Sequence, residues 1–238
     1  MRITVDEGPR YAVFFVPPAQ SDLYRFGSAV IGYDCYAAEP VDQPIEFKSN
    51  PEDWRRLTAE PRRYGFHATL KAPFHLSPSC TEAQLVSAIQ SFVGLGHAVP
   101  RIAPTVQILN GFAAIVPLNS DAALATLADS CTTIFDAFRA PMSARERAQR
   151  VALGLNQSQI SNLDRWGYSY VLSDFQFHMT LTGKIQGRRR DKTLAVIQKC
   201  FHRLVGNREF AVDRIALLKQ DGPSAFFRVV SHASLRLD

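Results

Sequence analysis

The sequence predicts an α+β fold built from two related lobes. Amphipathic helices and antiparallel hairpins are mixed along the chain, which is typical of this fold class. One strand motif occurs twice, with its histidines 111 residues apart, and an amphipathic helix follows each copy. No proline- or glycine-rich linker divides the 238 residues. We therefore expect a single domain over residues 1–238, with no independent second domain.

The composition is that of an ordinary globular protein. Hydrophobic residues make up 46% and charged residues 21%, which excludes a disordered, collagen-like or disulfide-scaffold protein. No apolar run approaches the roughly 18 residues of a membrane span, and the N-terminus lacks the apolar stretch of a secretory signal. Four scattered cysteines form no CxxC pair, so we expect free thiols and a reducing, cytoplasmic location.

The net charge of +5 suits a small anionic partner. It is too weak for a long nucleic acid, whose binding requires basic stripes that neutralise many phosphates. The densest basic cluster, Arg188-Arg189-Arg190, is typical of a solvated turn or helix start. We expect a small phosphate-containing substrate and no membrane, with short RNA ends left open and the oligomeric state unspecified.

The first third of the chain predicts two strands separated by a loop. Tyr11–Val16 is apolar and rich in β-formers, and Pro17 ends it. Residues 37–53 are rich in proline and acids, which favours a loop. Tyr64–Lys71 predicts the second strand, ended by Pro73.

Capping and turn signals place the later elements. Thr81 predicts a helix start, because Gln84 stands where a capping box requires it. Thr105–Pro117 predicts a hairpin with Asn110-Gly111 at its turn. The remaining expected elements are a helix capped by Asp121, short helices within 139–168, a strand at Phe175–Leu181, a helix at 191–205, and a closing hairpin of Phe210–Leu218 with Ala225–Val230.

The duplicated motif is Phe-His-x-Thr-Leu, with an apolar residue at x. It occurs as Phe66–Leu70 and again as Phe177–Leu181. Strand side chains alternate between faces, so each histidine shares a face with its threonine, roughly 6–7 Å along the strand. The apolar residues of each copy point to the other face and can pack beneath helices. If the lobes face each other, two imidazoles and two hydroxyls converge on one cleft.

These four side chains suit the opening of a phosphodiester. Histidine has an ordinary pKa near 6.5, so one imidazole can act as base and the other as acid near neutral pH. Threonine hydroxyls can donate hydrogen bonds to phosphoryl oxygens. One His-x-Thr is more often structural, but two copies in matching contexts favour a shared active site.

Longer strings around both motifs carry a family resemblance. The chain resembles the two-histidine phosphoesterase superfamily, which is marked by two His-x-Thr/Ser-apolar motifs on pseudo-symmetric lobes. RRYGFHATLKAPF (Arg62–Phe74), RFGSAVIGYD (Arg25–Asp34) and FQFHMTLTGK (Phe175–Lys184) are similar to an uncharacterised bacterial branch associated with phosphonate-utilisation genes.

The resemblance implies antiparallel sheets lining a central cleft, helices outside, and metal-independent chemistry on cyclic or 2′–5′ phosphodiesters. It implies that His67 and His178 are catalytic and that Thr69 and Thr180 bind phosphate. Which histidine is the acid and which the base stays open. The branch suggests a sugar cyclic phosphate from phosphonate breakdown as a substrate.

Other residues near the motifs allow two interpretations. Lys71 keeps the parity of Thr69, and Lys184 keeps that of Thr180, so each is a candidate substrate-binding cation or a solvated strand end. The aromatic segment Trp166–Tyr170 is either packing or a contact for a sugar or base.

Competing chemistries lack their motifs. There is no HExxH, no His-x-His and no acid inside either motif, so no metal is expected. GxGxxG, GxxxxGK[ST] and GxSxG are also absent, so no cofactor is expected. We predict a cyclic phosphodiesterase for a small nucleotide or sugar cyclic phosphate. The alternatives are a non-catalytic module that binds nucleotides or RNA ends, and an enzyme that processes or ligates 2′–5′ RNA ends.

Overall fold

A computed structural model describes residues 8–47, 51–119, 121–206 and 208–235. Its main feature is a seven-stranded sheet of order β11-β10-β1-β4-β8-β7-β6 in which all neighbouring strands are antiparallel. The α+β prediction with antiparallel sheets is therefore confirmed. The strands are β1 Arg10–Phe15, β4 Ala68–His75, β6 Pro104–Leu109, β7 Phe112–Pro117, β8 Met179–Lys184, β10 Arg214–Gln220 and β11 Arg228–Ser234.

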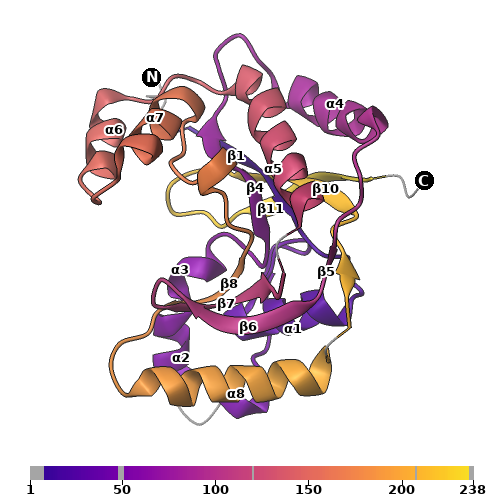
Figure 1. Ribbon diagram of the computed structural model, residues 1–238, viewed down its shortest axis with the longest axis vertical. Coiled ribbons are helices and arrows are strands. Elements are labelled where there is room, and N and C mark those ends of the chain that lie inside the picture. The colour runs from indigo at the N-terminus through magenta and orange to yellow at the C-terminus, as the bar shows by residue number, and fades with distance from the viewer. Residues whose placement is uncertain (1–7, 48–50, 120, 207, 236–238) are drawn as a thin grey trace.

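Two small sheets stand beside the main one. They pair β2 (Tyr33–Asp34) with β3 (Glu39–Pro40), and β5 (Arg101–Ile102) with β9 (Phe210–Ala211). The latter pair lies where the chain passes between the upper and lower parts of the molecule (Figure 1).

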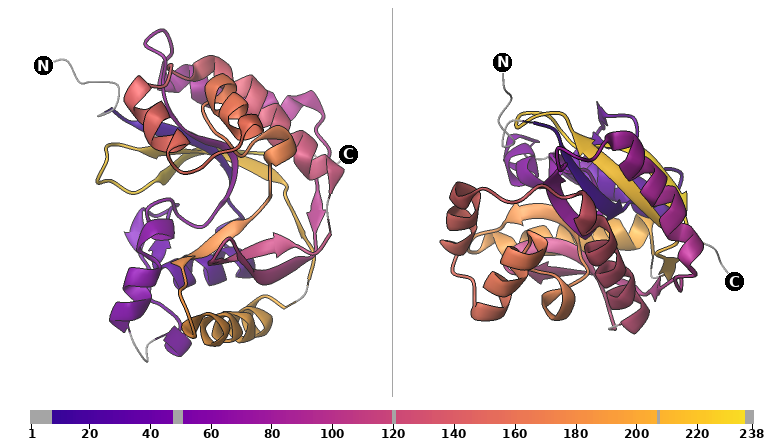
Figure 2. Two further views of the ribbon diagram at one scale, coloured as in Figure 1. Left: turned by 60° about the vertical axis from the view of Figure 1, so that its left-hand side comes forward. Right: turned by 90° about the horizontal axis from the view of Figure 1, so that it is seen from above.

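The seven-stranded sheet is narrowest at its centre. Strands β4 and β8 pair only through Ala68 and Met179, whereas β6 and β7 pair along their whole length. In Figure 1 and Figure 2 the half β11-β10-β1-β4 lies above the half β8-β7-β6. The two histidine motifs meet at this joint.

Several helices pack on the sheet half opposite to the strand that they follow in sequence. Helices α1 (Asp22–Ile31), α2 (Pro51–Leu57) and α3 (Ala59–Arg62) follow β1 in sequence but contact β8, which belongs to the other half. Helices α4 (Glu82–Phe92) and α5 (Ala122–Phe135) contact the half that holds β4, β10 and β11. The remaining helices are α6 Ala144–Val151, α7 Gln157–Trp166 and α8 Arg189–Leu204, with short 3-10 turns η2 Ile45–Phe47, η3 Val93–Leu95, η4 Asp136–Phe138 and η5 Leu172–Asp174.

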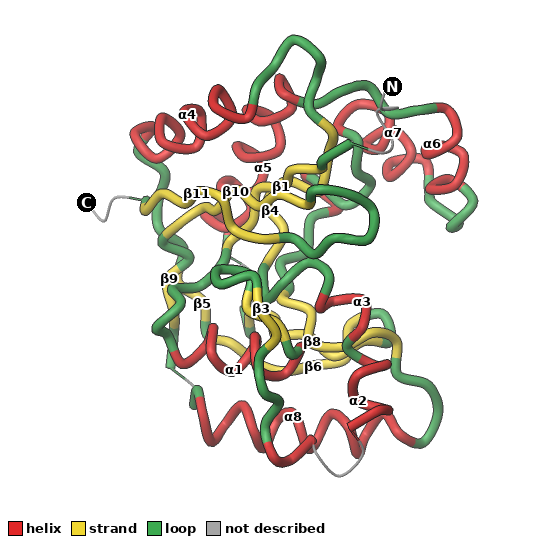
Figure 3. The backbone as a smooth tube through the Cα atoms, turned by 180° about the vertical axis from the view of Figure 1, so that it is seen from behind, coloured by secondary structure: helices red, strands yellow, loops and turns green. Residues whose placement is uncertain are grey.

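Helix α8 runs along the outside of the lower half, against β6 and α1, as the view from behind shows (Figure 3). Helices α6 and α7 stand together at the side of the upper half. None of the described helices is both long enough and apolar enough to cross a membrane.

Local sequence signals set most of the boundaries as predicted. Thr81 and Gln84 form both hydrogen bonds of the capping box at α4. The carboxylate of Asp121 accepts from two backbone amides at the start of α5. Asn110 and Gly111 have φ of 48° and 92°, the left-handed pair that a tight hairpin turn needs.

Several predicted boundaries were wrong. The expected loop at 37–53 contains the start of α2, where Pro51 occupies the first turn together with two acids, a helix-start pattern. Strand β4 begins at Ala68 rather than Tyr64, because Gly65 adopts φ +77° and turns the chain before His67. Likewise, β8 begins at Met179 rather than Phe175.

Strand β4 also continues through Pro73, which was expected to end it. The register with β1 shifts between the pairs Tyr11–Phe74 and Val13–Lys71, so the proline lies at an irregularity where no ladder hydrogen bond is required.

The apolar face of each motif is buried as predicted. Phe66, Ala68 and Leu70 of the first copy are at most 2% exposed, and their counterparts Phe177, Met179 and Leu181 are at most 4% exposed. All four cysteines are free thiols, as expected, and three of them are buried.

Candidate active site

The single pairing between β4 and β8 determines which residues meet. Because Ala68 lies opposite Met179 in an antiparallel pair, extending the register by one residue places His67 opposite Thr180 and Thr69 opposite His178. All four residues line one cavity of about 360 Å³. The structure thus brings together the two histidines and two threonines that the sequence singled out.

His67 has a defined tautomer. Its Nδ1 lies 2.8 Å from the Gly65 carbonyl oxygen, which can only accept, so Nδ1 carries the proton. In the neutral ring Nε2 is then an acceptor, and the Thr69 hydroxyl, 3.3 Å away, donates to it. The ring stacks on Phe14 with centroids 3.8 Å apart. Burial, with a smaller contribution from His178, lowers the pKa of His67 to about 4.

His178 repeats this arrangement in a more open setting. Its Nδ1 lies 2.8 Å from the Gln176 carbonyl oxygen, so Nε2 is again the acceptor atom of the neutral ring. Its aromatic neighbour Phe112 is tilted by 49° at a centroid distance of 5.7 Å rather than stacked. Burial lowers the pKa of His178, and the hydrogen bond to Gln176 opposes this. Both imidazoles are therefore neutral near pH 7 in the free protein.

Aromatic rings form the walls of the cavity. Phe14, Tyr64, Phe112 and Tyr168 line it, and Glu60 stands on the same lining. Sequence reasoning assigned Phe14 and Phe112 only to strands, and no local pattern distinguishes them from core residues. A second cavity of about 610 Å³ adjoins the first and shares Thr69, His178, Tyr168 and Lys184 with it.

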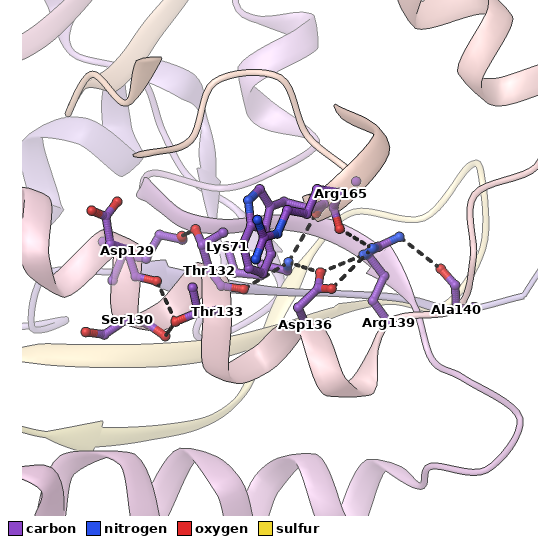
Figure 4. Close-up of polar contacts among 12 residues, drawn as sticks. Lys71, Asp129, Ser130, Thr132, Thr133, Asp136, Arg139, Ala140 and Arg165 are labelled. Carbon is purple, nitrogen blue, oxygen red and sulfur yellow. Dashed lines mark hydrogen bonds and ion pairs between the residues drawn. The ribbon is translucent and has the colours of Figure 1, made fainter. Parts of the chain in front are cut away.

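The prediction for Lys71 was wrong. Its side chain is only 2% exposed, and Nζ lies 2.6 Å from an Asp136 carboxylate oxygen, away from the cavity lining (Figure 4). The cause is a bulge in β4: Phe14 pairs with Thr69 but Val13 pairs with Lys71, so one extra residue breaks the parity after Thr69. Burial lowers the pKa of the Lys71 ammonium, and the ion pair with Asp136 opposes this.

Lys184 does line the cavity, with an exposed side chain. Strand β8 also carries an irregularity, between the pairs Ala114–Thr180 and Phe112–Lys184. Here two extra residues are inserted, and an even number preserves the parity of Thr180 and Lys184. Its role in binding substrate stays a prediction.

No cluster of three or more His, Cys, Asp or Glu side chains suited to a metal ion occurs within the described ranges. The expectation that the site uses no metal stays a prediction.

Residues 69–228 match the model of the family described as "Protein of unknown function (DUF1045)". The chain belongs to this family, and the matched segment includes Thr69 and the whole second motif. The family description assigns no activity.

Two relatives are named ribose 1,5-bisphosphate phosphokinase PhnN. The protein from Janthinobacterium sp. (strain Marseille) is 33% identical over 231 residues, which cover 95% of this chain and 51% of the relative. The protein from Laribacter hongkongensis (strain HLHK9) is 34% identical over 180 residues, covering 74% of this chain and 40% of the relative. The chain thus spans about half the length of these relatives or less.

Solved structures with a similar fold include E. coli LigT complexed with 3′-AMP, with a TM-score of 0.45, 11% identity, and coverage of 97% of this chain and 100% of LigT. Kluyveromyces marxianus Usb1 has a TM-score of 0.42 and 12% identity, covering 98% of this chain and 100% of Usb1. A protein described as a phosphoesterase has a TM-score of 0.42 and 13% identity, covering 97% and 100%.

Proposed function

We propose that this protein is a metal-independent cyclic phosphodiesterase that opens a small nucleotide or sugar cyclic phosphate. The observation that carries the proposal is the pairing of the motifs across Ala68 and Met179. It directs two imidazoles, each with its Nδ1 proton held by a carbonyl, and two hydroxyls to one cavity. In this proposal the two halves of the sheet act as two lobes, and each contributes one imidazole and one hydroxyl.

We assign the role of general base to His67, because its ring stays neutral throughout the range near neutrality. Its lowered pKa of about 4 keeps Nε2 unprotonated at any pH near neutrality. In the proposed step, His67 Nε2 takes a proton from water as the water oxygen attacks phosphorus. The ester P–O bond breaks opposite the entering oxygen, and the cyclic diester becomes a phosphate monoester.

His178 supplies the proton to the leaving alkoxide. Burial disfavours its charged form in the free protein, but a phosphate anion beside Nε2 favours the imidazolium. We therefore propose that substrate binding itself charges His178. After product release, the proton on His67 returns to solvent and His178 again takes one up with the next substrate.

The hydroxyls of Thr69 and Thr180 hold the phosphoryl oxygens, and Lys184 attracts the anion at the rim of the cavity. Hydrogen bonds to developing negative charge are strongest where water is excluded, as among the aromatic walls here. A cavity of about 360 Å³ suits a mononucleotide or phosphosugar better than a polymer.

The names of the relatives support a ribose phosphate as the sugar in question. Opening a cyclic phosphate of a ribose phosphate yields a ribose bisphosphate, the compound class in those names. This chain carries no GxxxxGK[ST] motif, so the kinase reaction is not part of the proposal.

The test is turnover of 2′,3′-cyclic nucleotides and ribose cyclic phosphates in the presence of EDTA. The proposal expects a phosphate monoester product from wild type and turnover lowered by about 10³-fold in His67→Ala and in His178→Ala. Full activity in either variant, or no turnover across the panel, would contradict it. Tight binding without product would instead indicate a binding module, and a strong preference for oligonucleotides would indicate an enzyme for RNA ends.

A further inference from the structure

Three successive backbone carbonyls at the end of α7 each accept a hydrogen bond from a different cationic side chain. Arg139 donates to the Arg165 carbonyl at 3.0 Å, Lys71 to the Trp166 carbonyl at 3.2 Å, and Arg150 to the Gly167 carbonyl at 2.6 Å. We call these three donors the carbonyl clamp. They come from three separate parts of the chain: Lys71 lies in β4, Arg139 follows η4 and Arg150 lies in α6.

Two carboxylates hold the three donors of the clamp in place. Asp136 pairs with Lys71 at 2.6 Å and with Arg139 at 2.7 Å (Figure 4). Glu146 pairs with Arg150 at 2.6 Å. Lys71 donates in addition to the Thr132 carbonyl of α5. Cations at the C-terminus of a helix are stabilised by its dipole, and here their side chains are largely buried.

Gly167 leaves the space that the clamp needs. It ends α7 in the left-handed conformation with φ +74°, and a Cβ placed there would lie 2.8 Å from Arg139 Cδ. A side chain at position 167 would therefore collide with Arg139, so only glycine fits this turn. The direction in which the chain leaves α7 is closely determined as a result.

The next residue along the chain is Tyr168, which lines both the catalytic cavity and the adjoining second cavity. Burial raises the pKa of the Tyr168 phenol to about 12. Its ring meets Tyr170 edge-on at 5.6 Å. Among the hydrogen bonds of the described residues, none involves the phenol oxygen of Tyr168, and the residue is half-buried at the cavity, so this hydroxyl can reach a ligand there.

We propose that the carbonyl clamp positions Tyr168 against the ring that a substrate carries beyond its phosphate, which is a base or a sugar. Tyr168 then determines specificity. Lys71, Arg139 and Arg150 are positioning residues. The proposal rests on the proposed function for the site in which Tyr168 acts. It gives Lys71 a role in place of the one predicted from the sequence.

The first test measures, in the absence of substrate, whether the clamp restrains the backbone after α7. Arg150→Gln removes one donor, and the matched control Arg147→Gln removes an exposed ion pair from α6 to Asp164 of the same helix α7 while leaving all three carbonyl contacts intact. We expect faster hydrogen–deuterium exchange of residues 165–171 in Arg150→Gln, at least about tenfold, and no change in Arg147→Gln. Equal exchange in both variants would overturn the clamp.

The second test asks whether the clamp acts through Tyr168. We expect Tyr168→Ala and Arg150→Gln each to raise KM for a 2′,3′-cyclic nucleotide about tenfold with kcat little changed, since stacking on a base is worth ~1–3 kcal/mol. The double variant should be no worse than Tyr168→Ala, and Arg150→Lys should recover part of the loss. Additive effects, or an unchanged KM in Tyr168→Ala, would overturn the proposal.

A parallel measurement separates this inference from the proposed function. Binding of adenosine 2′-monophosphate and of ribose 5-phosphate is measured by calorimetry on the same variants. If wild type turns over no cyclic phosphate, the proposed function fails, but the same non-additive pattern in Kd would still support the clamp. If wild type is active and neither KM nor Kd responds to Tyr168→Ala, only the present inference fails.

Discussion

The two histidine motifs share their backbone geometry and differ in what surrounds them. In both, Nδ1 bonds the carbonyl two residues earlier at 2.8 Å, which makes Nε2 the acceptor atom of the neutral ring. The first ring is stacked on Phe14 and has a pKa of about 4, whereas the second meets Phe112 at a tilt. Equal motifs therefore acquire unequal proton affinities from their neighbours, which is what a division into base and acid requires.

The lysines that follow the motifs differ more. A one-residue bulge turns Lys71 into the packed side of β4, while a two-residue insertion keeps Lys184 at the cavity. The alternation of side chains along a strand therefore predicts which face a residue occupies only up to the first bulge. Side chains before and after the bulge serve different purposes.

The largest expected effect comes from removing either imidazole. His67→Ala and His178→Ala should each lower kcat by about 10³-fold, as loss of general acid–base catalysis does. The double variant should be little worse than either single one, because the two act on one step. Steady-state kinetics with a 2′,3′-cyclic nucleotide measures this, and independent, multiplying effects would show that the motifs do not share a site.

A smaller effect is expected from the hydroxyls. Thr180→Val should reduce kcat/KM by about 10²-fold, and Thr180→Ser should retain most activity because it keeps the hydrogen-bond donor. Thr69→Val should behave similarly, with the additional loss of its contact to His67 Nε2. If the serine variants are as impaired as the valine variants, the threonines act through packing and not through their hydroxyls.

Substitution of Lys71 is expected to affect stability, and substitution of Lys184 is expected to affect substrate binding. Lys71→Met should destabilise folding by about 3 kcal/mol, because it breaks a buried ion pair, though Asp136 keeps Arg139 as a partner. Lys184→Met should change the unfolding free energy by less than about 0.5 kcal/mol and raise KM about tenfold. Urea unfolding and kinetics on both variants check this, and the reverse assignment would refute the corrected role of Lys71.

Local signals made much of the fold predictable. The capping box at Thr81, the aspartate cap at Asp121 and the Asn110-Gly111 turn each depend on neighbouring residues only, and each appears where expected. The alternation of buried and cavity-facing residues within the motifs was also readable, because it spans only five residues.

What the sequence did not reveal depends on partners far along the chain. The bulge after Thr69 arises from pairing with β1, and β4 and β8 pair only through Ala68 and Met179. The stacking of Phe14 on His67 and the contact of Lys71 with the Trp166 carbonyl join residues more than 50 positions apart. No short window of sequence contains that information.

The most direct test of the acid–base pair is the pH dependence of kcat/KM, which reports the ionisation of the free enzyme. His67 must be neutral, so the rate should fall below about pH 4, where its imidazole becomes charged. His178 must take up a proton, so the rate should fall as pH rises through its own pKa, which burial places below the ordinary value of 6.5. The account predicts a bell-shaped profile with its maximum on the acid side of 6.5, and a rate that stays constant between about pH 5 and 8 would contradict it.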